Sequence, residues 1–182
     1  TGFIFKVIYD VDFESLNFGS NNVDKIGNGQ NQNDIVLYTN VITIEGNSID
    51  AVVKTVSVDN VDKFDNYDDN DSNSSFFSPK LDFKTGGGSV IFNFSFIASG
   101  TYVDETNIGD EVKLKNFYVN TYDIDGNGRN NTNQYNEFQR YSSYELGSDT
   151  KLSVITNTSQ NLIKFRSDTD QNSSDSFADA HR

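Results

Sequence analysis

The sequence predicts an all-β protein, an antiparallel β-sandwich with calcium-bound loops, and three observations lead to this prediction. Apolar residues alternate with polar ones in several short segments, as in strands that bury one face. The segments between them are rich in Gly, Asn and Asp, which favour turns. With 15 Phe and 9 Tyr among 182 residues, the chain has enough apolar side chains to form a core.

The expected strands follow one another along the whole chain. Segment 35–58 has the pattern of a hairpin whose turn lies at 45–48. In segment 89–98, strict alternation places Val90, Phe92, Phe94 and Phe96 on one face. Together these patterns indicate about eight to ten short antiparallel strands. The candidate strands are residues 3–13, 35–44, 49–58, 89–98, 112–122, 151–156 and 162–165.

One segment is ambiguous between strand and helix. Tyr135, Phe138, Tyr141 and Tyr144 recur at every third position, and Gly147 has the position of a helix C-cap. A strict period of three drifts around a helix, so these side chains would not stay on one face. We therefore expect a strand, with a helix as the alternative.

Charge and composition exclude several classes of function. The formal net charge is −13, which repels nucleic acids and anionic membranes. The chain has no Cys, which excludes a thiol nucleophile. Its single His lies near the C-terminus, which argues against a Ser-His-Asp triad and a His-ligated zinc site. No apolar run reaches the roughly 18 residues of a membrane span. We expect a non-enzymatic, monomeric module of a longer extracellular polypeptide, with one domain over residues 1–175 and a flexible tail over 176–182.

The motif Asp-x-Asp-x-Asn occurs three times in a chain with 21 Asp and 24 Asn. In a tight loop, the side-chain oxygens at the first, third and fifth positions of this motif converge on one hard cation. Calcium suits such an all-oxygen ligand set, whereas magnesium keeps more of its water. The repeated spacing therefore predicts calcium as the cofactor.

The strongest calcium loop is predicted at Asp123, Asp125 and Asn127. Gly at the sixth position allows the sharp turn of a calcium loop, and the backbone carbonyl of Arg129 is the next expected ligand. The twelfth position is Gln, not the Glu of an EF-hand, so Glu137 is the candidate for the later carboxylate ligand. The alternative is a hairpin turn rich in Asp and Asn.

Three further acidic clusters are weaker metal candidates. Asp69, Asp71 and Asn73 form the second motif, and Asp168 and Asp170 begin the third. Asp10 and Asp12 alternate along an expected strand, so their like charges face one another unless a cation lies between them. For each cluster, a solvated acidic segment is the alternative.

Aromatic residues beside these loops are candidates for a ligand groove. Tyr67, Tyr122 and Tyr135 are the ligand-binding candidates, with core packing as the alternative. A calcium ion with an open coordination position could hold a ligand carboxylate, and so allow an acidic protein to bind an acidic group.

The segments that carry these motifs resemble the peptide-binding domains of giant bacterial repeats-in-toxin (RTX) adhesins. The similar stretches are Phe-Tyr-Val-Asn-Thr-Tyr-Asp-Ile-Asp-Gly-Asn-Gly over residues 117–128, followed by Glu137 and Phe138. The stretches 5–13 and 38–41 also fit this family, and the resemblance extends over most of the chain, from residue 3 to about residue 165.

The resemblance implies a fold and a function. It implies a β-sandwich with several calcium ions that binds peptides or proteins through a free C-terminal carboxylate, with calcium taking part in the contact. It also implies a place on the bacterial cell surface, with partners on the surfaces of other cells. By this resemblance, Asp123, Asp125 and Asn127 are calcium ligands, and Glu137 is a further candidate.

Three other functions remain open from the sequence. A calcium-stabilised carbohydrate-binding module also fits the fold, although a chain without Trp lacks the usual sugar platform, and glycans stay possible partners. A structural extender domain is a second alternative. A glycosidase with a carboxylate pair is the third, but no carboxylate has a plainly apolar sequence context.

Overall fold

The computed structural model describes most of the chain: residues 8–10, 16–19, 23–25, 29–68, 75–115, 118–121, 124, 126–127, 132–148, 150, 152–167 and 178–181. The chain divides into two compact units, unit 1 (Thr1–Leu114) and unit 2 (Lys115–Arg182). The described residues form strands and no helix. Each unit has its own sheets and its own core.

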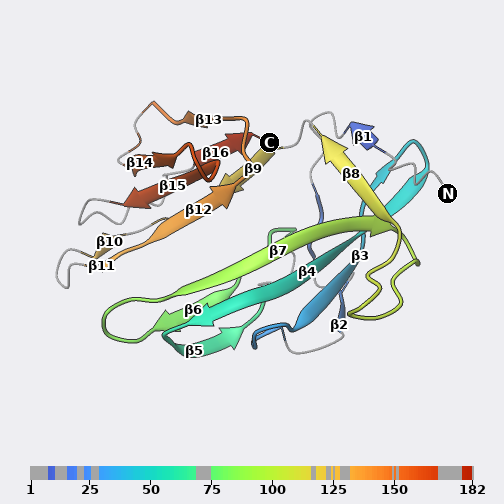
Figure 1. The fold of residues 1–182 in the computed structure, drawn as a ribbon, viewed down its shortest axis with the longest axis horizontal. Helices are drawn as coiled ribbons and strands as arrows, with labels where there is room; N and C mark the ends of the chain where they lie inside the picture. The colour runs from blue at the N-terminus through green and yellow to red at the C-terminus, as the bar shows by residue number, and fades with distance from the viewer. Residues whose placement is uncertain are drawn as a thin grey trace. The chain divides into compact units, whose positions relative to one another are not determined.

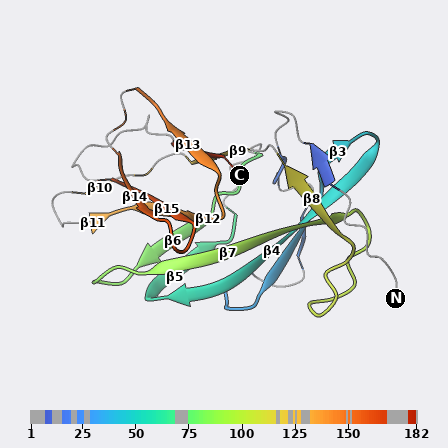
Figure 2. The same cartoon turned by 45° about the horizontal axis from the view of Figure 1, so that its top comes forward.

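Unit 1 is built on a six-stranded antiparallel sheet with the order β1-β8-β7-β4-β3-β2. The long strands β4 and β7 lie side by side at its centre (Figures 1 and 2). A separate hairpin pairs β5 with β6. The strands are β1 (Ile8–Asp10), β2 (Val23–Lys25), β3 (Ile35–Ile44), β4 (Asn47–Asp59), β5 (Val61–Asn66), β6 (Lys80–Phe83), β7 (Ser89–Ala98) and β8 (Glu111–Lys115).

The β3–β4 hairpin is closed by a two-residue turn. Glu45 and Gly46 both have positive φ angles, 52° and 78°, as the two central residues of a type I′ turn require. The turn follows Ile44 and precedes Asn47, so the pairing register of the hairpin is fixed at its tip. The expected turn at 45–48 is thus shortened to its first two residues.

Both faces of the unit 1 sheet are covered by apolar side chains. On one face, Phe64 of β5 and Phe77 contact Phe92 of β7, with ring centroids 6.4 and 5.0 Å apart. The other face carries a buried cluster of Ile35, Leu37, Val52 and Ile97, against which Tyr102 and Ile108 pack. Because β3 and β4 are buried on both faces, their sequences are nearly continuous apolar runs.

Unit 2 consists of short antiparallel strands in three sheets. The sheet β12-β15-β14 and the sheet β13-β16-β9 have three strands each, and β10 pairs with β11. Its core contains Ile124, Ile163 and Phe165, and Leu146 of β13 packs against this cluster. The strands are β9 (Tyr118–Thr121), β10 (Gly126–Asn127), β11 (Thr132–Asn133), β12 (Tyr135–Gln139), β13 (Ser143–Leu146), β14 (Leu152–Asn157), β15 (Leu162–Ser167) and β16 (Ala178–His181).

The predicted fold class is confirmed: the chain is all-β, with antiparallel sheets that pack as in a β-sandwich. The ambiguous segment around Tyr135 forms the strands β12 and β13, as expected. The described residues form sixteen strands, more than expected, and strand β16 lies in the segment expected to be a flexible tail. The calcium-bound loops stay a prediction.

Candidate functional site

Described residues next to two of the three acidic motifs meet at Asn133 and Gln134 of unit 2. Gly126 of β10 is the antiparallel partner of Asn133. The backbone N–H of Ser167, at the end of β15, donates to the carbonyl oxygen of Gln134 at 3.1 Å. In the sequence, Asp125 directly precedes Gly126 and Asp168 directly follows Ser167. Strand pairing therefore brings together the described ends of two segments that are far apart in the sequence.

The strongest motif is attached to the core of unit 2 through its second residue. Ile124, which stands between Asp123 and Asp125 in the sequence, is 1% exposed. It belongs to the buried cluster with Ile163 and Phe165 of β15. Burial of an isoleucine side chain stabilises a protein by about 1.5–3 kcal/mol, so this contact restrains the position of the motif.

The solvent-facing side of the sheet β12-β15-β14 carries charged and apolar groups in adjacent rows. Glu137, Lys164 and Ile155 are Cα partners across the three strands. The Lys164 ammonium Nζ lies 3.0 Å from Oε2 of Glu137 and 4.2 Å from the ring centroid of Tyr135. We call this surface, made of Tyr135, Glu137, Ile155, Lys164 and Arg166, the lysine face.

Glu137, which the sequence suggests as a late calcium ligand, is the ion-pair partner of Lys164 in this structure. The Glu137 carboxylate lies on the solvent-facing side of β12, whereas Phe138 packs against the core. A calcium ion at Glu137 would share this carboxylate with the Lys164 ammonium or compete with it. The geometry therefore favours a role for Glu137 at the lysine face.

Most of the other predicted metal ligands lie outside the described residues. Asn127 is in β10 and Asp10 is in β1, and both are described only as parts of these strands. Within the part of the chain that the structure describes, no three His, Cys, Asp or Glu side chains gather as a metal site would require. The predicted residues outside it are Asp12, Asp69, Asp71, Asn73, Tyr122, Asp123, Asp125, Arg129, Asp168 and Asp170.

The assignment of Tyr67 to a ligand groove has to be corrected. Its side chain is 2% exposed, and its hydroxyl donates to the carbonyl oxygen of Val53 at 3.2 Å. The ring packs edge-on against Phe77 and Phe92, with centroids 5.4 and 5.7 Å away. Burial raises the pKa of the Tyr67 hydroxyl. Tyr67 is a core residue, whereas Tyr135 is exposed as a ligand-binding residue requires.

Asp68 directly precedes the acidic motif at Asp69 and lies outside it, so the motif spacing does not select this residue. Its Oδ2 accepts a hydrogen bond from the Tyr38 hydroxyl at 2.7 Å, and its Oδ1 accepts one from the backbone N–H of Ser78 at 2.9 Å. Burial, together with the hydrogen bond to Asp68, raises the pKa of Tyr38. Asp68 therefore fastens the start of the acidic loop to the sheet and to Ser78 beyond it.

Comparison with protein families, with curated proteins and with solved structures finds no match to this chain. No helix among the described residues has the length and apolar character needed to cross a membrane.

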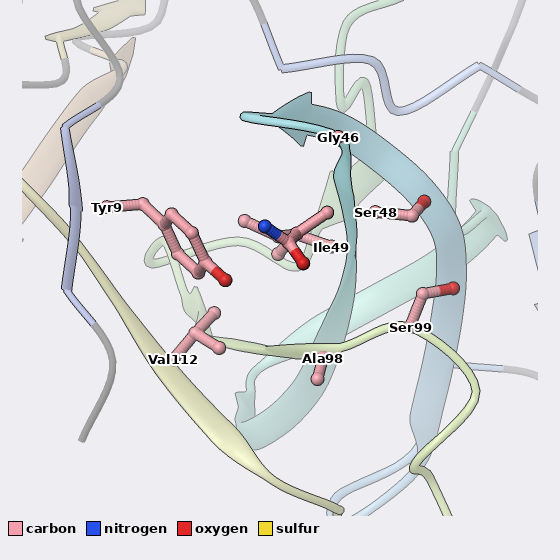
Figure 3. Close-up of a pocket in the computed structure, with 8 residues that line it drawn as sticks. Tyr9, Gly46, Ser48, Ile49, Ala98, Ser99 and Val112 are labelled. Atoms are coloured by element: carbon pink, nitrogen blue, oxygen red, sulfur yellow. The ribbon is translucent and has the colours of Figure 1, made fainter. Parts of the chain in front are cut away.

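Unit 1 contains a pocket of about 290 Å³ at the tip of the β3–β4 hairpin. Figure 3 shows the Tyr9 ring facing Ile49 and Val112, while the hydroxyls of Ser48 and Ser99 point away from the ring. The residues that line it are Tyr9, Gly46, Asn47, Ser48, Ile49, Ala98, Ser99 and Val112, none of them charged. The volume is just below the usual range of small-molecule pockets, and uncharged polar and apolar side chains line it together.

Proposed function

We propose that the chain is a calcium-dependent ligand-binding module of a bacterial cell-surface adhesin. In this proposal it binds the free C-terminal carboxylate of peptides or proteins on other cells. Asp123, Asp125 and Asn127, with the carbonyl of Arg129, supply oxygen ligands to calcium. The ion leaves a coordination position for the ligand carboxylate, which offsets the repulsion from a protein of net charge −13.

The observation that carries this proposal is the meeting of two chain segments at Asn133 and Gln134. One segment follows the motif that begins at Asp123, and the other precedes the motif that begins at Asp168. The Asp-x-Asp-x-Asn spacing of both motifs places carboxylates close together in the sequence, and such like charges repel each other unless a cation compensates them. A divalent ion bound by oxygen ligands is the compensation that this motif spacing favours.

Calorimetric titration of short peptides tests the proposal directly. The probes are tetrapeptides without acidic side chains that end in Ala, Leu, Phe or Thr, each made with a free C-terminus and as the C-terminal amide. They are titrated into the protein in millimolar calcium and, separately, in chelator. We expect free-carboxylate peptides to bind in calcium, and we expect amidation or chelation to abolish binding.

Two results would contradict the proposal. Equal binding of the free and amidated forms would show that the terminal carboxylate is not recognised. Absence of binding by every free-carboxylate peptide would contradict the peptide function, and direct binding of a simple neutral sugar would then favour the carbohydrate-binding alternative. The variant Asp123→Asn/Asp125→Asn should lose the calcium-dependent binding, because amides are weaker ligands for a hard cation than carboxylates.

A further inference from the structure

The negative charge of this protein is distributed unevenly between its two units. Unit 1 contains 18 acidic and seven basic residues, which gives it a net charge of −11. Unit 2 contains nine acidic and seven basic residues, which gives it a net charge of −2. An anionic partner therefore meets far less repulsion at unit 2, and the lysine face lies on this unit.

The lysine face presents a cation between two exposed apolar groups. The Lys164 side chain is 28% exposed and lies on the central strand β15. Tyr135 on β12 is 40% exposed, and Ile155 on β14 is 48% exposed. Arg166 stands two residues further along β15, on the same face and opposite Tyr135. An apolar surface beside an ammonium group suits a ligand that has a carboxylate next to an apolar side chain.

In this structure, Glu137 occupies the place where a ligand carboxylate would bind. Its Oε2 lies 3.0 Å from Lys164 Nζ, and the Tyr135 ring lies against the same ammonium. An ammonium has three donor hydrogens, and at a partly exposed site one carboxylate does not saturate it. A ligand carboxylate can therefore share Lys164 with Glu137 or take its place.

We infer that the lysine face is a docking surface for an acidic peptide segment, in which a Glu or Asp side chain lies next to an aromatic or aliphatic residue. Lys164 holds the carboxylate, and Tyr135 and Ile155 pack against the neighbouring apolar side chain. Ile155 offers no hydrogen bond to sugar hydroxyls, which favours a peptide over an acidic sugar. This site uses a side-chain carboxylate and no metal, so it is independent of the proposed calcium site.

The test uses a probe without a free C-terminal carboxylate, which is the group that the proposed calcium site recognises. The probe is the N-acetylated, C-terminally amidated peptide Gly-Phe-Glu-Phe-Gly, titrated into the whole chain in millimolar calcium at low salt. A matched peptide has Gln in place of Glu. The protein variants are Lys164→Gln, Lys164→Arg and Glu137→Gln, with Lys113→Gln as the control at an exposed lysine of unit 1. Thermal melts verify that each variant is folded.

The variants should shift the affinity in opposite directions. Lys164→Gln should weaken binding about tenfold, because a charge-assisted hydrogen bond is lost, and Lys164→Arg should retain it. Glu137→Gln should strengthen binding by a few-fold, because it removes the internal competitor for Lys164. Lys113→Gln should bind like the wild type, and the Gln peptide should bind weakly to every variant.

Several results would overturn this inference. Unchanged binding in Lys164→Gln, weaker binding in Glu137→Gln, or no binding of the Glu peptide to the wild type would each exclude the proposed surface. Equally tight binding of glucuronate at Lys164 would exclude a peptide as the specific occupant. None of these results affects the calcium proposal, which concerns a different carboxylate.

Discussion

Asp50 shows how a single carboxylate can hold two parts of unit 1 together. Asp50 is a charged residue near the start of strand β4, and its side chain is only 1% exposed. Oδ1 accepts the backbone N–H of Asn40 at 2.7 Å, and Oδ2 accepts that of Gly100 at 3.0 Å. Asn40 has a positive φ of 53° and lies where the register between β3 and β4 shifts, so its N–H has no ladder partner there.

Replacing Asp50 should therefore lower the stability of unit 1. Asp50→Ala leaves two backbone donors without their acceptor, and we expect the free energy of unfolding to fall by about 2 kcal/mol. Asp50→Asn retains one acceptor oxygen and should cost about half as much. Asp62→Ala, at an exposed position of β5, is the control and should change stability by less than about 0.5 kcal/mol. Denaturant unfolding measures all three variants, and equal stabilities of Asp50→Ala and Asp62→Ala would contradict this role.

The candidate site was predictable only in part at the scale of residues. Tyr135 and Glu137 are close in sequence to the strongest motif, so proximity alone was enough to select them. Lys164 joins them only through the pairing of β12 with β15, and the sequence contains no local signal for this pairing. Tyr67, like Tyr135, stands close to an acidic motif in the sequence, but its ring packs against Phe77 and Phe92. Burial of individual aromatic residues depends on tertiary packing, which periodicity does not report.

At the scale of elements, the strands with clear alternation were predictable and the acidic strands were not. The expected ranges 35–44 and 89–98 are those of β3 and β7. The hairpin β5–β6 was missed because Asp and Lys occupy many of its positions, which makes it resemble a loop. Phe64 of this hairpin contacts Phe92 of β7, but no residue of β5 or β6 is fully buried. Alternation predicts strands that bury a whole face, and this hairpin does not bury one.

Two glycines with similar backbone angles should respond very differently to substitution. Gly29 and Gly46 have φ angles of 72° and 78°, so Ala is strained at both positions. A Cβ at Gly29 would overlap the ring of Tyr67, whereas a Cβ at Gly46 would meet no atom within 4 Å. We expect Gly46→Ala to cost about 1 kcal/mol and Gly29→Ala about 3 kcal/mol or more, because only the latter forces the buried ring to move. Chemical denaturation compares them, and equal losses would contradict the packing of Tyr67 against this turn.

At the scale of the whole molecule, the sequence did not reveal that the chain forms two compact units. The expected strand at 112–122 runs across the boundary, where the structure has β8 and β9 as separate strands. No Pro-rich or Gly-rich linker marks this position. The uneven charge of the two units was also hidden in the overall value of −13. Where no change of composition marks a domain boundary, the pairing of strands determines it. The pairing partners cannot be predicted from the local sequence of a strand.

The proposed function depends on calcium binding, which a calcium titration of the metal-free protein measures. The wild type and the variant Asp123→Asn/Asp125→Asn are stripped with chelator, titrated with calcium in a calorimeter, and then melted with and without the ion. We predict that the wild type binds calcium and melts at a higher temperature with it, because an ion that binds only the folded state stabilises that state. The double variant should lose most of both effects. No binding heat and an unchanged melting temperature in the wild type would contradict the claim.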